Sequence, residues 1–139
     1  MYITWETYQC GNVLSLIVSC GWGFDMNTHS VYLYDTATGE QMTTAQLLET
    51  LQVEPETFLA AVRQAAAERF DGKYAGIGGD TDELVAERRA WTLSDENINL
   101  DVMTYADAAG NLYVYLPIGS IAGAASYEEP LTLDLGAAG

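Results

Sequence analysis

The sequence predicts an α+β fold, in which helices pack on one face of a mainly antiparallel sheet. Three expected strands come first, three expected helices follow, and three further strands end the chain, so the order is βββ-ααα-βββ. Hydrophobic residues make up 49% of the 139 residues and charged residues 18%, which provides a core and argues against disorder. We therefore expect residues 1–139 to form a single domain. We also expect this domain to be excised from a longer protein.

A β-hairpin is expected at the start of the chain. Residues 2–10 and 13–20 read as strands on either side of Gly11-Asn12, which suits a two-residue turn. The pairing that this turn imposes places Cys10 and Cys20 at opposite ends of the hairpin. Because a disulfide needs Cα atoms within ~7 Å, we expect two free thiols.

The alternation of the hairpin residues suggests which face is covered. Ser15 and Ser19 alternate with Val13 and Ile17, so this face is expected to be half-solvated or lightly covered. The opposite face is more apolar and is expected to pack on the rest of the domain; it carries Leu14, Leu16, Val18 and Cys20, with Ile3 and Trp5 as their cross-strand neighbours. A third strand is expected over residues 30–35.

The middle of the chain predicts three helices. Thr43 and Gln46 have the spacing of a capping box, which begins a helix. Pro55 suits the first position of a second helix, and Gly72 is expected to end it after an apolar stripe at helical spacing. Asp82, or the threonine before it, can cap a third and shorter helix.

The remaining residues predict β structure. Residues 98–102 alternate apolar and polar side chains, 107–111 read as a turn, and 112–118 form a dense apolar strand. A loop over 119–129 leads to a last strand at 131–135, and the tail after it is expected to fray.

The charge is strongly acidic and unevenly distributed. The net charge is −15, and all five basic residues lie between positions 63 and 89. Residues 1–62 and 90–139 hold seven acids each and no Lys or Arg. Such a field repels nucleic acid and anionic lipid and attracts cationic partners. The charge therefore serves either solubility alone or a surface that recognises a basic ligand.

His29 is the single histidine, so any Ser-His or Cys-His catalytic pair must use it. Ser19 and Cys20 are near in sequence, but both are expected on a strand, without a nucleophile elbow. We expect His29 to be solvated in the 21–30 loop or to cap a turn there, and we expect no enzymatic activity.

Metal and cofactor motifs are not recognisable in the sequence. The histidine and the two cysteines lack the spacing of a zinc site. Asp80, Asp82 and Glu83 resemble a fragment of a calcium loop but lack its spacing. We therefore expect neither a metal site nor a cofactor.

Aromatic residues on expected loops are the candidates for partner binding. Trp22 and Phe24 stand among glycines, and Tyr127 stands beside two acids. Aromatic residues fringed by acids suit a contact with a basic protein, although the first two could instead fold back over the core. The candidate partner-binding residues are Trp22, Phe24, His29, Tyr127, Glu128 and Glu129.

Three segments carry a resemblance to a known family. They are LSLIVSCGWG (14–23), VYLYDTATGEQMTTAQLL (31–48) and INLDVMTYADAAGNLYVYLPIGSIAGAA (98–125). In this order they resemble the extracytoplasmic C-terminal domain of RsiV-type anti-sigma factors. The family's Gly-Ala-His after the glycine loop is represented only by His29, so the resemblance implies the fold and not individual binding residues.

The resemblance implies a receptor domain outside the membrane. Characterised members of that family bind lysozyme, a small basic enzyme, and related domains accompany cell-wall polysaccharide deacetylases. We therefore expect a non-catalytic, extracytoplasmic, cell-envelope binding or sensor domain that recognises a basic protein such as lysozyme or a cell-wall ligand. The alternatives are a hydrolase or deacetylase-associated domain that acts on cell-wall glycan through two acids, and an accessory domain without a ligand.

Overall fold

A computed structural model describes residues 1–21, 27–74, 82–120 and 130–138 of the chain. The predicted α+β class is confirmed. A short strand and a short helix form in addition to the predicted order, and one predicted strand (98–102) does not form. The elements in chain order are β1 (Tyr2–Cys10), β2 (Val13–Gly21), β3 (Asn27–Asp35), β4 (Gln41–Met42), α1 (Thr44–Thr50), α2 (Pro55–Tyr74), α3 (Asp82–Thr92), β5 (Met103–Ala106), β6 (Leu112–Tyr115), β7 (Leu131–Thr132) and α4 (Leu135–Ala138).

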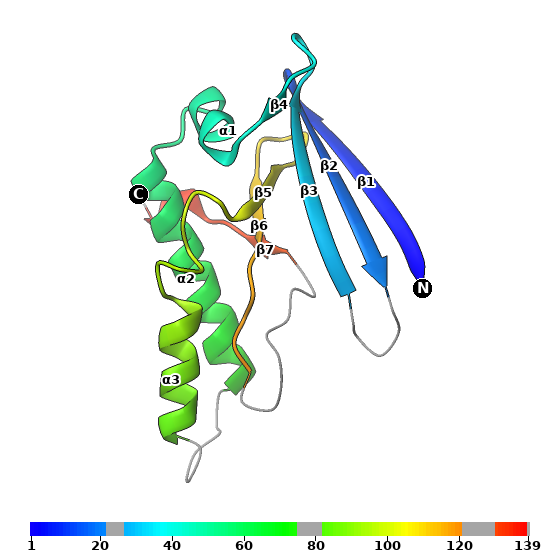
Figure 1. Cartoon of the computed structure of the whole chain (residues 1–139). Coiled ribbons are helices and arrows are strands. Elements are labelled where there is room, and N and C mark those ends of the chain that lie inside the picture. The colour runs from blue at the N-terminus through cyan, green and yellow to red at the C-terminus, as the bar shows by residue number, and fades with distance from the viewer. Residues whose placement is uncertain (22–26, 75–81, 121–129, 139) are drawn as a thin grey trace.

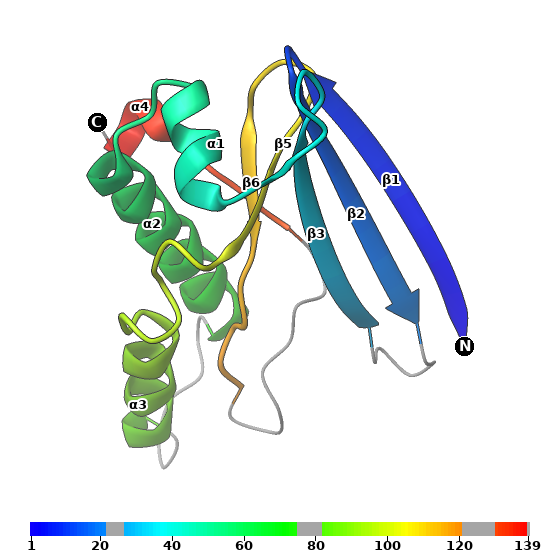
Figure 2. The same cartoon turned by 45° about the horizontal axis from the view of Figure 1, so that its top comes forward.

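The strands form two antiparallel sheets instead of one. The first sheet has the order β1-β2-β3-β4 and the second has the order β5-β6-β7. The second sheet lies between the helices and the first sheet (Figure 1), and the turned view in Figure 2 shows the same three layers. Its strand β5 contacts β1, β2 and β3, while β7 contacts α2. The helices therefore cover the second sheet, and the second sheet covers the first.

The predicted hairpin and its register are confirmed. Cys10 pairs with Val13 and Cys20 pairs with Ile3, so the two cysteines lie at opposite ends of the hairpin and both are free. Gly11 has a φ of +56°, a backbone conformation that two-residue hairpin loops need and that glycine adopts without strain.

The prediction of which hairpin face is covered is wrong. Val13, Ser15 and Ile17 are buried at 1%, 0% and 2% exposure, whereas Trp5 is 70% exposed. The Ser15 hydroxyl accepts a hydrogen bond from the Ala106 amide at 3.3 Å, which ties β2 to β5. A serine is small and offers an acceptor, so the second sheet can pack closely on the face that looked half-solvated.

The helices begin where the sequence predicts. Thr43 forms the expected capping box with Gln46, because its hydroxyl accepts from the Gln46 amide and its own amide donates to the Gln46 side chain. α2 begins at Pro55 as predicted but does not end at Gly72. It continues to Tyr74, whose buried hydroxyl donates to the Gly119 carbonyl at 3.2 Å and so anchors one more turn.

The predicted strand over 98–102 is wrong. This segment forms turns, in which the Asn99 side-chain amide donates to the carbonyl oxygens of Asp95 and Glu96 at 3.0 Å each. Ile98 and Val102 are nevertheless buried, so the alternation reflected a buried turn and not a strand.

The last strands are shorter than predicted. β6 ends at Tyr115, two residues before Pro117, which has no amide to donate to a ladder. The predicted strand over 131–135 is paired only at Leu131–Thr132, and Leu135 begins α4, which contacts α2. Residues 135–138 are therefore helical and contact α2 instead of fraying.

Candidate partner-binding surface

The side of the first sheet that faces away from the second sheet is called the outer face. Cross-strand partners point to the same side of a sheet, so the register defines its members. They are Ile3, Trp5, Thr7 and Gln9 on β1, Leu14, Leu16, Val18 and Cys20 on β2, and Thr28, Ser30, Tyr32 and Tyr34 on β3. None of these residues is charged.

The outer face exposes contiguous apolar side chains. Trp5, Ile3 and Tyr32 are 70%, 52% and 38% exposed. Trp5 is the cross-strand partner of Val18, and Leu16 is the partner of Tyr32, so the exposed side chains have half-buried apolar neighbours. Scattered apolar residues are ordinary on a protein surface, but a contiguous group of them is typical of an interaction site.

The basic residues lie on the other side of the molecule. All five belong to α2 and α3, and the second sheet separates these helices from the outer face (Figures 1 and 2). Arg63 is ion-paired with Asp95 at 2.7 Å, and Arg89 with Asp71 at 2.8 Å. The hydrogen bond from Arg89 lowers the pKa of Asp71, so this pair stays ionised well below neutral pH.

Acidic residues lie at the border of the first sheet. Glu6 is exposed on the edge strand β1, and Glu40 is exposed just after β3. Glu6 pairs with Ile17 and Asp35 pairs with Val13, so the side chains of Glu6 and Asp35 point to the inner side of the sheet. The Asp35 carboxylate accepts a hydrogen bond from the Ala37 amide at 2.9 Å, so it is held in the turn. The outer face itself is uncharged, and these acids make its surroundings negative.

The edge of the first sheet at β1 is open among the residues that the structure describes, because β1 pairs only with β2. All nine residues of β1 pair in one unbroken register. In a hairpin with a two-residue turn, alternate residues direct their backbone groups toward the partner strand. By this rule Ile3, Trp5, Thr7 and Gln9 direct their amides and carbonyls away from β2, toward the open edge.

His29 lies on a strand and not in a loop, which corrects the prediction. β3 begins at Asn27 and pairs with β2 along its whole length, so His29 comes opposite Ser19 on the inner face. The Ser19 hydroxyl lies 2.8 Å from His29 Nδ1, and the imidazole stacks on Tyr115 with 4.2 Å between ring centroids. These contacts fix the half-buried ring in the interior between the sheets.

The Ser19–His29 contact does not have the setting of a nucleophile. Ser19 is paired within β2, between Thr4 on β1 and His29 on β3. Catalytic serines of the nucleophile-elbow type project from a sharp strand-to-helix turn, where both the substrate and an oxyanion donor can approach. The geometry therefore favours a role in joining the layers.

Three tyrosines stack on one another between the two sheets, and a fourth lies tilted beside them. The Tyr105 ring lies 5.5 Å from Tyr8 and 5.0 Å from Tyr113, both nearly parallel to it, and 6.0 Å from Tyr115. Burial raises the pKa of Tyr105 and of Tyr115, so both hydroxyls stay protonated well above neutral pH. The stack joins β1 to β5 and β6, and no periodicity in the sequence indicated it.

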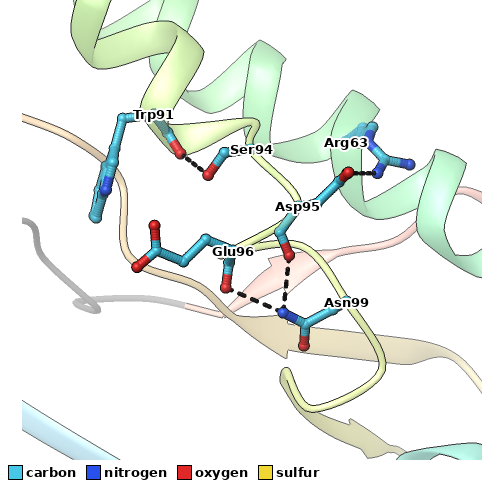
Figure 3. A network of polar contacts seen from close by, with 6 residues as sticks. All are labelled: Arg63, Trp91, Ser94, Asp95, Glu96 and Asn99. Atoms are coloured by element: carbon cyan, nitrogen blue, oxygen red, sulfur yellow. Dashed lines mark hydrogen bonds and ion pairs between the residues drawn. The ribbon is translucent and has the colours of Figure 1, made fainter.

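A polar turn lies on the helical side of the molecule. Figure 3 shows Ser94 donating to the Trp91 carbonyl at 2.7 Å and Asn99 closing the turn onto Asp95 and Glu96. A recess of about 210 Å³ follows this turn, with Glu96 and Asp101 in its lining. Asp95 of this turn is also ion-paired with Arg63, which ties the turn to α2.

Most of the sequence-predicted binding residues fall on undescribed segments. Trp22, Phe24, Tyr127, Glu128 and Glu129 lie outside the described residues, and only His29 can be placed. Within the described ranges, no three His, Cys, Asp or Glu side chains gather as a metal site, and no helix is long and apolar enough to cross a bilayer.

Comparison with known proteins adds no relative. No family model, no curated protein and no solved structure matches this chain.

The sequence did not single out Trp5, Ile3 and Tyr32 as surface residues. Ile3 and Trp5 were assigned to the correct side of the hairpin, but that side was expected to be covered. Val31 and Leu33 lie on the same face as Ile17 and Ser15, so the third strand adds apolar residues to the face that is in fact covered.

Proposed function

We propose that this chain is a non-catalytic recognition domain that binds a basic partner protein through its outer face. The observation that carries the proposal is the exposed apolar surface around Trp5, in a protein of net charge −15 whose basic residues are all on the helical side. Apolar contact supplies affinity at the centre of an interface, and charge complementarity supplies selectivity and fast association.

An extracytoplasmic, cell-envelope location is part of the proposal. Its support is the resemblance of three segments to the lysozyme-binding domain of RsiV-type anti-sigma factors. Lysozyme is a small basic protein, so its charge complements the net charge of −15 of this chain, to which Glu6, Asp35 and Glu40 at the border of the first sheet contribute. Lysozyme is therefore the first partner to test, and cell-wall fragments are the second.

The test is a titration with lysozyme at low and high ionic strength. We expect micromolar or tighter binding that weakens steeply with salt, because screening acts on the long-range attraction between opposite net charges. Trp5→Ser should weaken binding at least tenfold. Trp91→Ser is the matched control, since Trp91 is also exposed but lies at the end of α3 on the helical side.

Three results would count against the proposal. Binding that does not change with salt would reject the electrostatic contribution. Equal losses of affinity in Trp5→Ser and Trp91→Ser would reject the outer face as the binding site. Turnover of cell-wall fragments by the purified protein would replace recognition with catalysis.

A further inference from the structure

We infer that the open edge of β1 binds an extended segment of the basic partner as an added antiparallel strand, in which apolar and basic residues alternate. This inference rests on the proposed function and specifies how the partner is held. Strand addition at a sheet edge derives affinity from backbone hydrogen bonds and selectivity from alternate side chains.

The first observation is that β1 lacks the usual protection of an edge strand. Proteins protect their edges with charged residues, proline, bulges or very short strands. β1 has nine residues, one charged residue (Glu6), no proline and an unbroken register with β2. The opposite edge is different, because there β4 pairs with Leu33 and Tyr34 of β3. The β1 edge is therefore suited to accept a strand.

The second observation defines the side chains of the added strand. Its residues opposite Ile3 and Trp5 would lie on the outer face, beside side chains that are 52% and 70% exposed, and would therefore be apolar. The residue opposite Glu6 would lie on the inner side, where the carboxylate is exposed and accepts a hydrogen bond from Tyr8 at 3.0 Å. A lysine or arginine there would pair with Glu6.

The third observation argues against a second copy of this chain as the occupant. Two copies would each carry a net charge of −15. An antiparallel pairing of two β1 strands centred on the middle of the strand would place Glu6 opposite Glu6, and like charges in directly opposite positions destabilise a sheet. A basic segment would instead be attracted by the net charge of the protein, and its lysine or arginine would attract Glu6 instead of repelling it.

The test uses a short synthetic peptide that alternates valine and lysine, in three forms. One is unmodified, one is N-methylated at the valines, and one is N-methylated at the lysines. When the valines lie on the outer face, their amides face β1 and the lysine amides face away. The two methylated peptides have the same charge and the same number of methyl groups, so they differ only in which amides can donate to β1.

We expect valine methylation to lower the affinity at least about tenfold, since several backbone hydrogen bonds are lost, and lysine methylation to have little effect. Glu6→Gln should weaken binding more than Glu49→Gln, which removes an equal charge from α1. Hydrogen exchange should show new protection at the amides of Ile3, Trp5, Thr7 and Gln9. Thr7→Pro removes an outward amide from the edge and should abolish peptide binding.

Equal binding of the two methylated peptides, or unchanged exchange at these four amides, would overturn strand addition. Protection of these amides that depends on protein concentration, together with a dimer mass by sedimentation, would assign the edge to a second copy and would also overturn it. If strand addition fails while Trp5→Ser still weakens lysozyme binding, the proposed function stands. If peptides bind as expected and no basic protein does, the partner in the proposed function is wrong.

Discussion

Ser15 on β2 and Ala106 on β5 are joined by a hydrogen bond of 3.3 Å from the Ala106 amide to the Ser15 hydroxyl. They are 91 residues apart in sequence, and the bond is buried between the two sheets. It turns the Ser15 side of the hairpin inward, so that Trp5 and its neighbours face solvent. The position of the candidate binding surface depends on this orientation.

The Ser15 bond predicts a specific loss of stability. Ser15→Ala leaves a buried amide without its acceptor and should lower the free energy of unfolding by about 1–2 kcal/mol. Ser30→Ala, on the exposed side of β3, is the matched control and should change it by less than about 0.5 kcal/mol. Urea denaturation followed by circular dichroism measures both. Equal values for the two variants would show that the Ser15 bond does not hold the sheets together.

His29 predicts a separation of stability from binding. His29→Ala removes the hydrogen bond to Ser19 and the stacking on Tyr115 at 4.2 Å, so the variant should unfold at a lower urea concentration. Since His29 is on the inner face, the affinity of the variant for lysozyme should equal that of the unmodified protein at a temperature where the variant stays folded. A weakened affinity with unchanged stability would place His29 in the binding site.

The buried tyrosines predict sensitivity to alkaline pH. Burial raises the pKa of Tyr105 and Tyr115 above that of an unfolded tyrosine, which is about 10. Their contribution to stability is therefore complete below pH ~10 and is lost as the pH rises above it, because only the unfolded chain ionises there. In an alkaline titration followed by tyrosinate absorbance, Tyr105 and Tyr115 should ionise after the exposed tyrosines and at the same pH at which the protein unfolds. Ionisation of all nine tyrosines near pH ~10 with the fold intact would contradict this.

Local signals in the sequence were sufficient for much of the fold. The hairpin register follows from Gly11-Asn12, and the start of α1 from the Thr43 capping box, because each depends on neighbouring residues only. The α+β class follows from the grouping of strands and helices. The outcome for Ser15 could not be predicted in this way, since its acceptor role depends on Ala106, far away in the sequence.

The candidate surface was harder to predict than the fold. Apolar residues occupy both faces of β2, so hydrophobicity alone could not decide which face is covered. The decision lies in tertiary contacts, such as the stacking of Tyr8 on Tyr105, that draw the less apolar face inward. The strand prediction over residues 98–102 was wrong for a related reason, because Ile98 and Val102 are buried although they lie in a turn.

The central claim is that the outer face around Trp5 is open in the free protein and covered by a basic partner. Fluorine NMR of the protein with fluorotryptophan at its three tryptophans tests this directly, with the Trp5 signal assigned from its absence in Trp5→Phe. In the free protein the Trp5 signal should be solvent-accessible. On addition of unlabelled lysozyme this signal should shift and lose accessibility, while that of Trp91 stays unchanged. A Trp5 signal that is inaccessible from the start, or that is unchanged at saturating lysozyme, would contradict the account.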